Sequence, residues 1–141
     1  MILFTHHPLM PTTERDTEGL WSVWMVRNHD EVRRLLKRYP NVRLAISGHH
    51  HAARVQTAGR ITYVSDPAIV TYPCAFRMYT VDRSGITLKL IGLDEQETIA
   101  RARELLIQDP YARIYDPAAP EKVAEYSAGL TKEDRETTIR L

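Results

Sequence analysis

Five of the six histidines stand in two clusters, His6-His7 and His49-His50-His51. Imidazole is the commonest side-chain ligand for Zn, Mn and Fe, and three imidazoles can hold one ion while leaving a coordination position open for water. The two clusters therefore predict a metal site with His6, His49 and His51 as ligands. Surface histidines without a function are the alternative interpretation.

Each histidine cluster directly follows a run of β-forming residues. Ligand sites in α/β folds lie at the carboxyl ends of their strands, which is where these clusters are expected. In an extended segment alternate side chains point to the same side, so His49 and His51 should face the metal together. Adjacent side chains diverge, so His7 and His50 are expected to orient the ligands or contact substrate rather than bind the metal.

The rest of the chain alternates β-type and helical segments, which predicts an α/β fold. Asn28 and Glu31 indicate a helix start, as do Asp94 and Glu97. Closely spaced runs in the middle of the chain predict a β-meander, and the last thirty residues are expected to form an appendage. The expected strands are residues 2–5, 42–47, 54–57, 60–65, 75–82 and 86–93, and the expected helices are 29–38, 94–108, 121–128 and one after Thr131.

Two sequence blocks resemble the calcineurin-like metallophosphoesterases. Residues 4–9 (FTHHPL) are similar to the H-x-P block of that family, and residues 47–51 (SGHHH) to its G-H-x-H block. The downstream residues 66–73 make the branch with class III cyclic-nucleotide phosphodiesterases the most similar one. The resemblance implies a partial metallophosphoesterase β-sandwich flanked by helices, the C-terminal half of that domain, over residues 1–93. Residues 94–141 would be a helical C-terminal extension.

The resemblance also implies a function for the histidines. His6 and His49 would bind the second metal of a two-metal site, and His51 the first. Two divalent ions (Mn, Fe or Zn) in such a site polarise the phosphoryl oxygen and lower the pKa of a bridging water that attacks it. The implied reaction is hydrolysis of a small-molecule phosphoester, and of a diester in particular.

Three blocks that supply the other ligands of this family do not occur in the sequence: Asp-x-His, Gly-Asp and Gly-Asn-His. Without their carboxylates the charge of two dications is uncompensated, so at most one ion should bind tightly. The chain is therefore expected to be the C-terminal portion of a phosphoesterase, with no complete catalytic set and no activity alone. Its exposed sheet edge predicts self-association, by edge pairing or by exchange of elements.

Asn28-His29-Asp30 repeats three letters of a missing block but is an unsuitable substitute. It follows the H-x-P block instead of preceding it, Arg27 replaces the flexible glycine, and Asn28 is explained as a helix cap. A different class of function also stays open. The chain would then be a non-catalytic three-histidine metal-binding or dimerisation module, with its interface formed by residues 10–25 and the tail.

Composition limits the partners and the compartment. Nineteen Lys and Arg against eighteen Asp and Glu give a net charge of +1, which predicts neither a nucleic-acid partner nor a membrane surface. A single cysteine cannot form an internal disulfide, and a cytoplasmic location is expected.

For the remaining residues that could take part in chemistry, a structural role is favoured over a functional one. The favoured roles are burial for Cys74, turns or helix caps for Asp66, Asp82 and Asp94, packing or an interface for Trp21 and Trp24, and solvated hairpin positions for Arg54 and Arg60.

Overall fold

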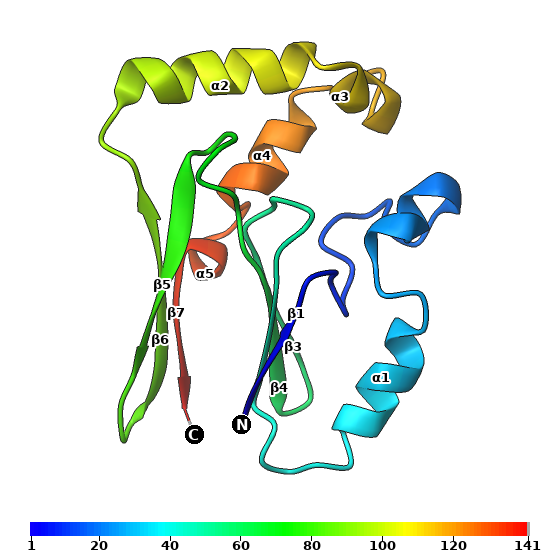
Figure 1. The fold of residues 1–141 in the computed structure, drawn as a ribbon, viewed down its shortest axis with the longest axis vertical. Coiled ribbons are helices and arrows are strands. Elements are labelled where there is room, and N and C mark those ends of the chain that lie inside the picture. The colour runs from blue at the N-terminus through cyan, green and yellow to red at the C-terminus, as the bar shows by residue number, and fades with distance from the viewer. Residues whose placement is uncertain (141) are drawn as a thin grey trace.

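A computed structural model describes residues 1–140 as two β-sheets packed against each other, with helices on one flank and at one end (Figure 1). Strands are β1 Ile2–Thr5, β2 Leu44–Ser47, β3 Arg54–Ala58, β4 Ile61–Ser65, β5 Ala75–Val81, β6 Gly85–Gly92 and β7 Glu136–Arg140. Helices are η1 Gly19–Trp24 (a 3-10 helix), α1 His29–Leu36, α2 Gln96–Gln108, α3 Pro110–Tyr115, α4 Lys122–Ala128 and α5 Lys132–Arg135.

The first sheet has the strand order β1-β2-β4-β3. Strands β1, β2 and β4 are parallel, and β3 pairs antiparallel with β4. The register aligns Thr5 with Ser47 and Ser47 with Ser65, so the three parallel strands end at one level. The residues that follow these strands, His6, Gly48 and Asp66, consequently lie at the same edge of the sheet.

The second sheet has the order β5-β6-β7, with both pairs antiparallel. Leu44, Ile46 and Val64 of the first sheet pack against Ile86 and Leu88 of the second in one buried cluster. This apolar layer holds the two sheets face to face.

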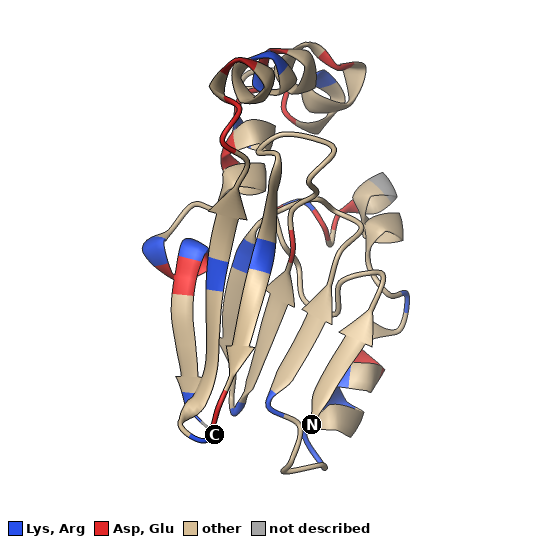
Figure 2. Ribbon diagram, turned by 60° about the vertical axis from the view of Figure 1, so that its left-hand side comes forward, with Lys and Arg blue, Asp and Glu red and all other residues tan. Residues whose placement is uncertain are grey.

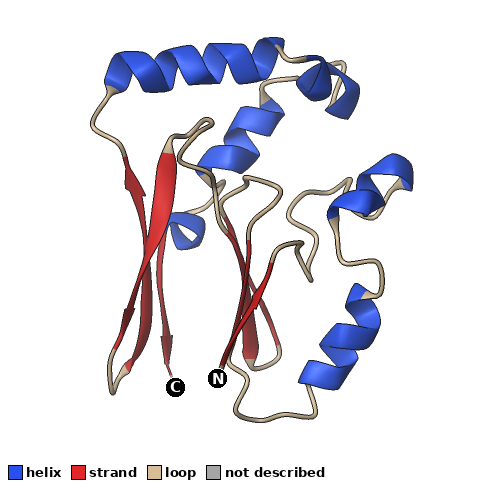
Figure 3. Cartoon of the chain, viewed as in Figure 1, coloured by secondary structure: helices blue, strands red, loops and turns tan. Residues whose placement is uncertain are grey.

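Helix α1 covers the opposite face of the first sheet (Figure 3). Val32 and Leu36 are four residues apart, which puts both on one side of the helix. They pack with Val42, Ala45 and Ile61 in a second buried cluster. The resulting layers, helix on sheet on sheet, hold the parallel strands rigidly below their carboxyl ends.

The α/β class is confirmed, and the six expected strands and the first two helices form near their predicted bounds. The expectation of one meander is wrong, because the hairpins β3-β4 and β5-β6 belong to different sheets. The chain passes from one sheet to the other through residues 66–74. Hairpin spacing shows that neighbouring strands pair, but it carries no information about which sheet the next hairpin joins.

Residues 96–135 carry four helices, α2 to α5, of which α3 was not expected from the sequence. The end of the chain is not an appendage, because β7 hydrogen-bonds to β6 and its Ile139 packs into the layer between the sheets. The alternating exposure of β7 is typical of a half-buried strand. The Asp94 cap is also wrong, since Glu95 is the cap residue of α2 and makes no side-chain cap bond.

Charged residues of both signs are interspersed along α1 and α2 (Figure 2). Within residues 1–140, no helix has the length and apolar character needed to cross a membrane.

Candidate metal centre

Three imidazoles meet where β1 and β2 end. His6, His7 and His49 each offer a ring nitrogen, and these nitrogens all lie within 4.8 Å of one another. His49 Nδ1 is 2.8 Å from His6 Nε2, and the His7 and His49 ring centroids are 4.0 Å apart. Residues that are more than forty positions apart in the chain thus form one cluster, which we call the histidine cluster (His6, His7 and His49).

Backbone contacts place the two segments against each other. The Gly48 N–H donates to the His6 carbonyl at 3.1 Å, continuing the parallel pairing of β1 and β2 by one bond. The Thr5 hydroxyl donates to the His7 carbonyl at 2.9 Å, which fixes the turn that follows β1. The histidines therefore project from rigid strand ends instead of from a free loop.

The segment after Gly48 is not extended, and this corrects the geometry expected for it. His49 and His51 have φ angles of 60° and 51°, in the left-handed region. For a residue with a Cβ this region costs about 1–2 kcal/mol, so surrounding contacts must hold the bend. The rule that alternate side chains point to one side does not apply to such a bend.

Because of this bend, the histidines that lie together differ from the set expected from the sequence. His7, expected to orient or contact substrate, belongs to the histidine cluster together with His6 and His49. The His51 ring is outside this group of three, and its Nδ1 lies 3.4 Å from the Thr71 hydroxyl. Coordination by His51 stays a prediction, whereas His7 is a candidate ligand that reasoning from an extended loop missed.

Electrostatics favour the metal-binding form of His49. Burial and the neighbouring imidazoles, His7 and His6 foremost, lower the pKa of His49. Burial and the imidazoles of His50 and His6 likewise lower the pKa of His51. A lower pKa means that the ring is neutral over more of the physiological range, and neutral imidazole is the form that binds metal.

The histidine cluster fits one transition-metal ion better than two. Ligand nitrogens at about 2.0–2.1 Å from a tetrahedral zinc ion lie about 3.3 Å from one another, so His6 and His49 need to separate only slightly. Among the described residues, no carboxylate belongs to this group of ligand atoms. Imidazole ligands carry no negative charge, so they do not offset the repulsion between two neighbouring divalent ions.

An aromatic side chain borders the histidine cluster. Trp24, from the end of η1, lies with its ring centroid 5.0 Å from that of His49 and 5.9 Å from that of His50. Trp21 packs elsewhere, edge-on to Tyr111 and Tyr115. The packing predicted for Trp21 is confirmed, while the contact of Trp24 with the histidines had no signal in the local sequence.

A buried carboxylate contacts the His49–His51 segment on its inner side. Asp16 is fully buried, and its Oδ1 lies 3.1 Å from Nε2 of His50, whose side chain is 3% exposed. Thr12 and Thr13 each donate a backbone N–H and a hydroxyl to Asp16, over 2.5–3.1 Å. Burial by itself raises the pKa of Asp16, but His50 and these hydroxyls outweigh it and lower the pKa to about 2.

The other acidic candidates have structural partners. Asp82 accepts from the Ser84 and Gly85 N–H groups, which confirms its turn role. Asp66, expected in a turn or cap, instead accepts from the buried Arg77 at 2.7 Å and from Tyr79. Cys74 is buried as expected.

The two arginine candidates are engaged within the fold. Arg54 is not simply solvated, because its Nη1 donates to Asp134 at 3.0 Å. Arg60 is exposed in the turn between β3 and β4, as expected, and donates to the Lys37 carbonyl. Neither guanidinium is thereby a free phosphate ligand at the histidine cluster.

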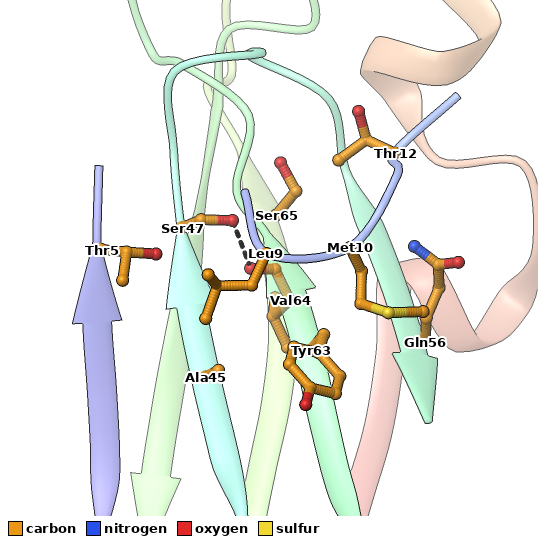
Figure 4. A pocket seen from close by; sticks show the side chains of 10 residues that line it. All are labelled: Thr5, Leu9, Met10, Thr12, Ala45, Ser47, Gln56, Tyr63, Val64 and Ser65. Atoms are coloured by element: carbon orange, nitrogen blue, oxygen red, sulfur yellow. Dashed lines mark hydrogen bonds between the residues drawn. The ribbon is translucent and has the colours of Figure 1, made fainter. Parts of the chain in front are cut away.

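The hollow between the ends of β1, β2 and β4 is too small for a substrate. Leu9 and Met10 close it, and Ser47 at its rim donates to the Val64 carbonyl (Figure 4). Its volume of about 10 Å³ is at the lower limit for one water molecule.

Comparison with protein-family models finds no matching family, and a search of the curated proteins finds no match.

Proposed function

We propose that this chain supplies the histidine-bearing portion of a metal-dependent phosphoesterase. The observation that carries the proposal is the meeting of His6, His7 and His49 at the carboxyl ends of two neighbouring parallel strands. The two-sheet core with α1 on its outer face is the arrangement that part of a metallophosphoesterase sandwich would have. The family resemblance of the two histidine blocks adds the reaction class.

A bound divalent ion would polarise the phosphoryl oxygen and acidify water. The chain's own contribution is to hold imidazoles at fixed positions and to leave the outer side of the histidine cluster open to a phosphoester. Because carboxylates are lacking in this cluster among the described residues, we expect one tightly bound ion and no turnover by the chain alone. The carboxylate-bearing blocks would come from another polypeptide segment.

Two measurements on the metal-loaded chain test this function. The chain with Mn²⁺ is expected to bind inorganic phosphate, seen as enhanced ³¹P relaxation, and to leave a chromogenic phosphodiester intact. His49→Ala should abolish the relaxation effect, whereas His29→Ala, a change on α1, should preserve it. Failure of the wild-type chain to bind Mn²⁺ or Zn²⁺ would overturn the proposal, and rapid hydrolysis would refute inactivity of the isolated chain.

The non-catalytic metal-binding or dimerisation module is the second candidate. The three-imidazole cluster without a carboxylate among the described residues favours it. Metal binding without any effect on phosphate relaxation would support this module over the phosphoesterase.

We further propose that the chain self-associates through β1. This strand forms one edge of its sheet, and its Phe4 side chain is 70% exposed. An exposed strand edge beside an apolar side chain is a template for pairing with another chain. Sedimentation should show concentration-dependent dimers that Phe4→Lys weakens, and a monomer at all concentrations would contradict this proposal.

A further inference from the structure

The histidine cluster depends on a bend whose stability needs an explanation. His49 and His51 both adopt left-handed backbone angles, and His50 lies between them. Such angles persist where the surroundings over-determine them. The side chain of His50 points away from solvent, and its Nε2 reaches the fully buried carboxylate of Asp16.

The other side of this contact is itself held in place. Asp16 belongs to the segment between β1 and η1, and Thr12 and Thr13 donate four hydrogen bonds to its carboxylate. The carboxylate of Asp16 is thus held in place from its own segment, and His50 Nε2 approaches it to 3.1 Å. In the chain, residues 12–16 lie between His7 and Trp24. The Trp24 ring borders both His49 and His50.

We propose that Asp16 is a positioning residue for the metal centre, acting through His50 to hold the bend that brings His49 to His6 and His7. An effect of Asp16 on metal affinity depends on the proposed metal function, whereas its contact with His50 does not. Asp16 does not belong to the histidine cluster and would contact neither metal nor substrate. Carboxylate partners that orient histidine ligands from behind typically change metal affinity 10- to 100-fold when removed.

The first test is metal affinity, measured by competition with a chromogenic chelator for Zn²⁺. Asp16→Asn is expected to weaken Zn²⁺ binding by roughly 10-fold or more. Asp134→Asn is the matched control, because Asp134 is equally buried but accepts from Arg54 and the Val55 N–H. It should lower thermal stability while leaving Zn²⁺ affinity within about twofold. Equal losses of affinity in the two variants would assign Asp16 a merely structural role.

A double-mutant cycle tests whether the effect passes through His50. His50→Ala should weaken Zn²⁺ binding as Asp16→Asn does, and the double variant should be no weaker than either single one, since coupled residues are not additive. His50→Gln retains a donor for Asp16 and should restore part of the affinity. Additive losses would overturn the proposal.

A measurement without metal separates this inference from the proposed function. Long-range ¹H–¹⁵N spectra of the imidazoles report the contact between His49 Nδ1 and His6 Nε2, which are 2.8 Å apart. Asp16→Asn should shift these resonances and Asp134→Asn should not. If the wild-type chain binds no metal but shows this pattern, the metal function fails and the positioning role stands. Unchanged His6 and His49 resonances in Asp16→Asn would refute the positioning role.

Discussion

Two regions of this protein each contain a fully buried aspartate, and they use it differently. Asp16 faces His50, at the end of the fold that carries the histidine cluster. Asp134 accepts from Arg54 and from the Val55 N–H, and its carbonyl accepts from the fully buried Arg77. The first aspartate holds a bend that carries candidate ligands, and the second joins α5 to the edge of the first sheet and to β5.

The difference lies in the partner. Arginine stays charged, so the contacts around Asp134 and Arg77 form a permanent brace between elements from distant parts of the chain. The partner of Asp16 is instead a histidine, the residue type from which the neighbouring cluster is made. Buried charge thus secures the fold in one region and arranges a candidate site in the other.

The largest effect is expected where the brace is broken. Asp134→Ala leaves Arg54 without its carboxylate and the Val55 N–H without its acceptor. The Arg54 side chain is partly exposed and can be resolvated, so the cost comes from the lost hydrogen bonds. Each hydrogen bond to a charged acceptor contributes roughly 1.5–3 kcal/mol, which puts the expected loss in free energy of unfolding at about 3–5 kcal/mol. Urea denaturation should show a loss in this range with Zn²⁺ affinity retained in the folded fraction. A loss below about 1 kcal/mol would remove the distinction between the two regions.

The next largest effect is expected on metal binding by the histidine cluster. His49→Ala deletes the side chain that lies between His6 and Trp24, and Zn²⁺ affinity should fall at least about 100-fold, beyond the range typical of an outer partner. His51→Ala should change it less, because His51 lies outside the three-histidine group. Calorimetric titration of the two variants sharpens the assignment, and a larger loss in His51→Ala would reinstate the ligand set expected from the sequence.

Acid should affect the contributions of Asp16 and Asp66 to stability with opposite signs. The pKa of Asp16 is lowered to about 2 by His50 and the threonines against the opposing effect of burial, so its stabilising contribution is present above pH 4 and is lost as pH falls towards 2. Burial raises the pKa of Asp66 despite Arg77, so protonating Asp66 relieves a cost of folding. Asp16→Asn should flatten the fall in unfolding free energy below pH 4, and Asp66→Asn should steepen it. Indistinguishable slopes in acid-titrated urea melts would contradict this.

The smallest effect is expected at Trp24. Trp24→Phe keeps an aromatic ring beside His49 and should change Zn²⁺ affinity by less than about threefold, since exchanges between aromatic contacts typically involve under about 1 kcal/mol. Trp24→Ala should cost more than Trp24→Phe in the same titration. Equal effects would mean that the ring does not support the histidine cluster.

Local patterns predicted much of the fold. Short β-forming runs identified six of the strands, and Asn28 with Glu31 located the start of α1. The same patterns missed β7, because an exposed alternating segment at the end of a chain resembles a tail until a neighbouring strand is known. They also missed which sheet each hairpin joins.

The candidate site divides in the same way. The sequence by itself determined the two histidine clusters, their position after strands and the absence of a carboxylate-rich motif beside them. Only the tertiary structure decided that His7 joins His6 and His49, that His51 turns towards Thr71, and that Asp16 stands behind His50. The physical reason is that parallel pairing of β1 and β2 and a left-handed bend set the direction of each ring, and both depend on contacts between residues far apart in the chain.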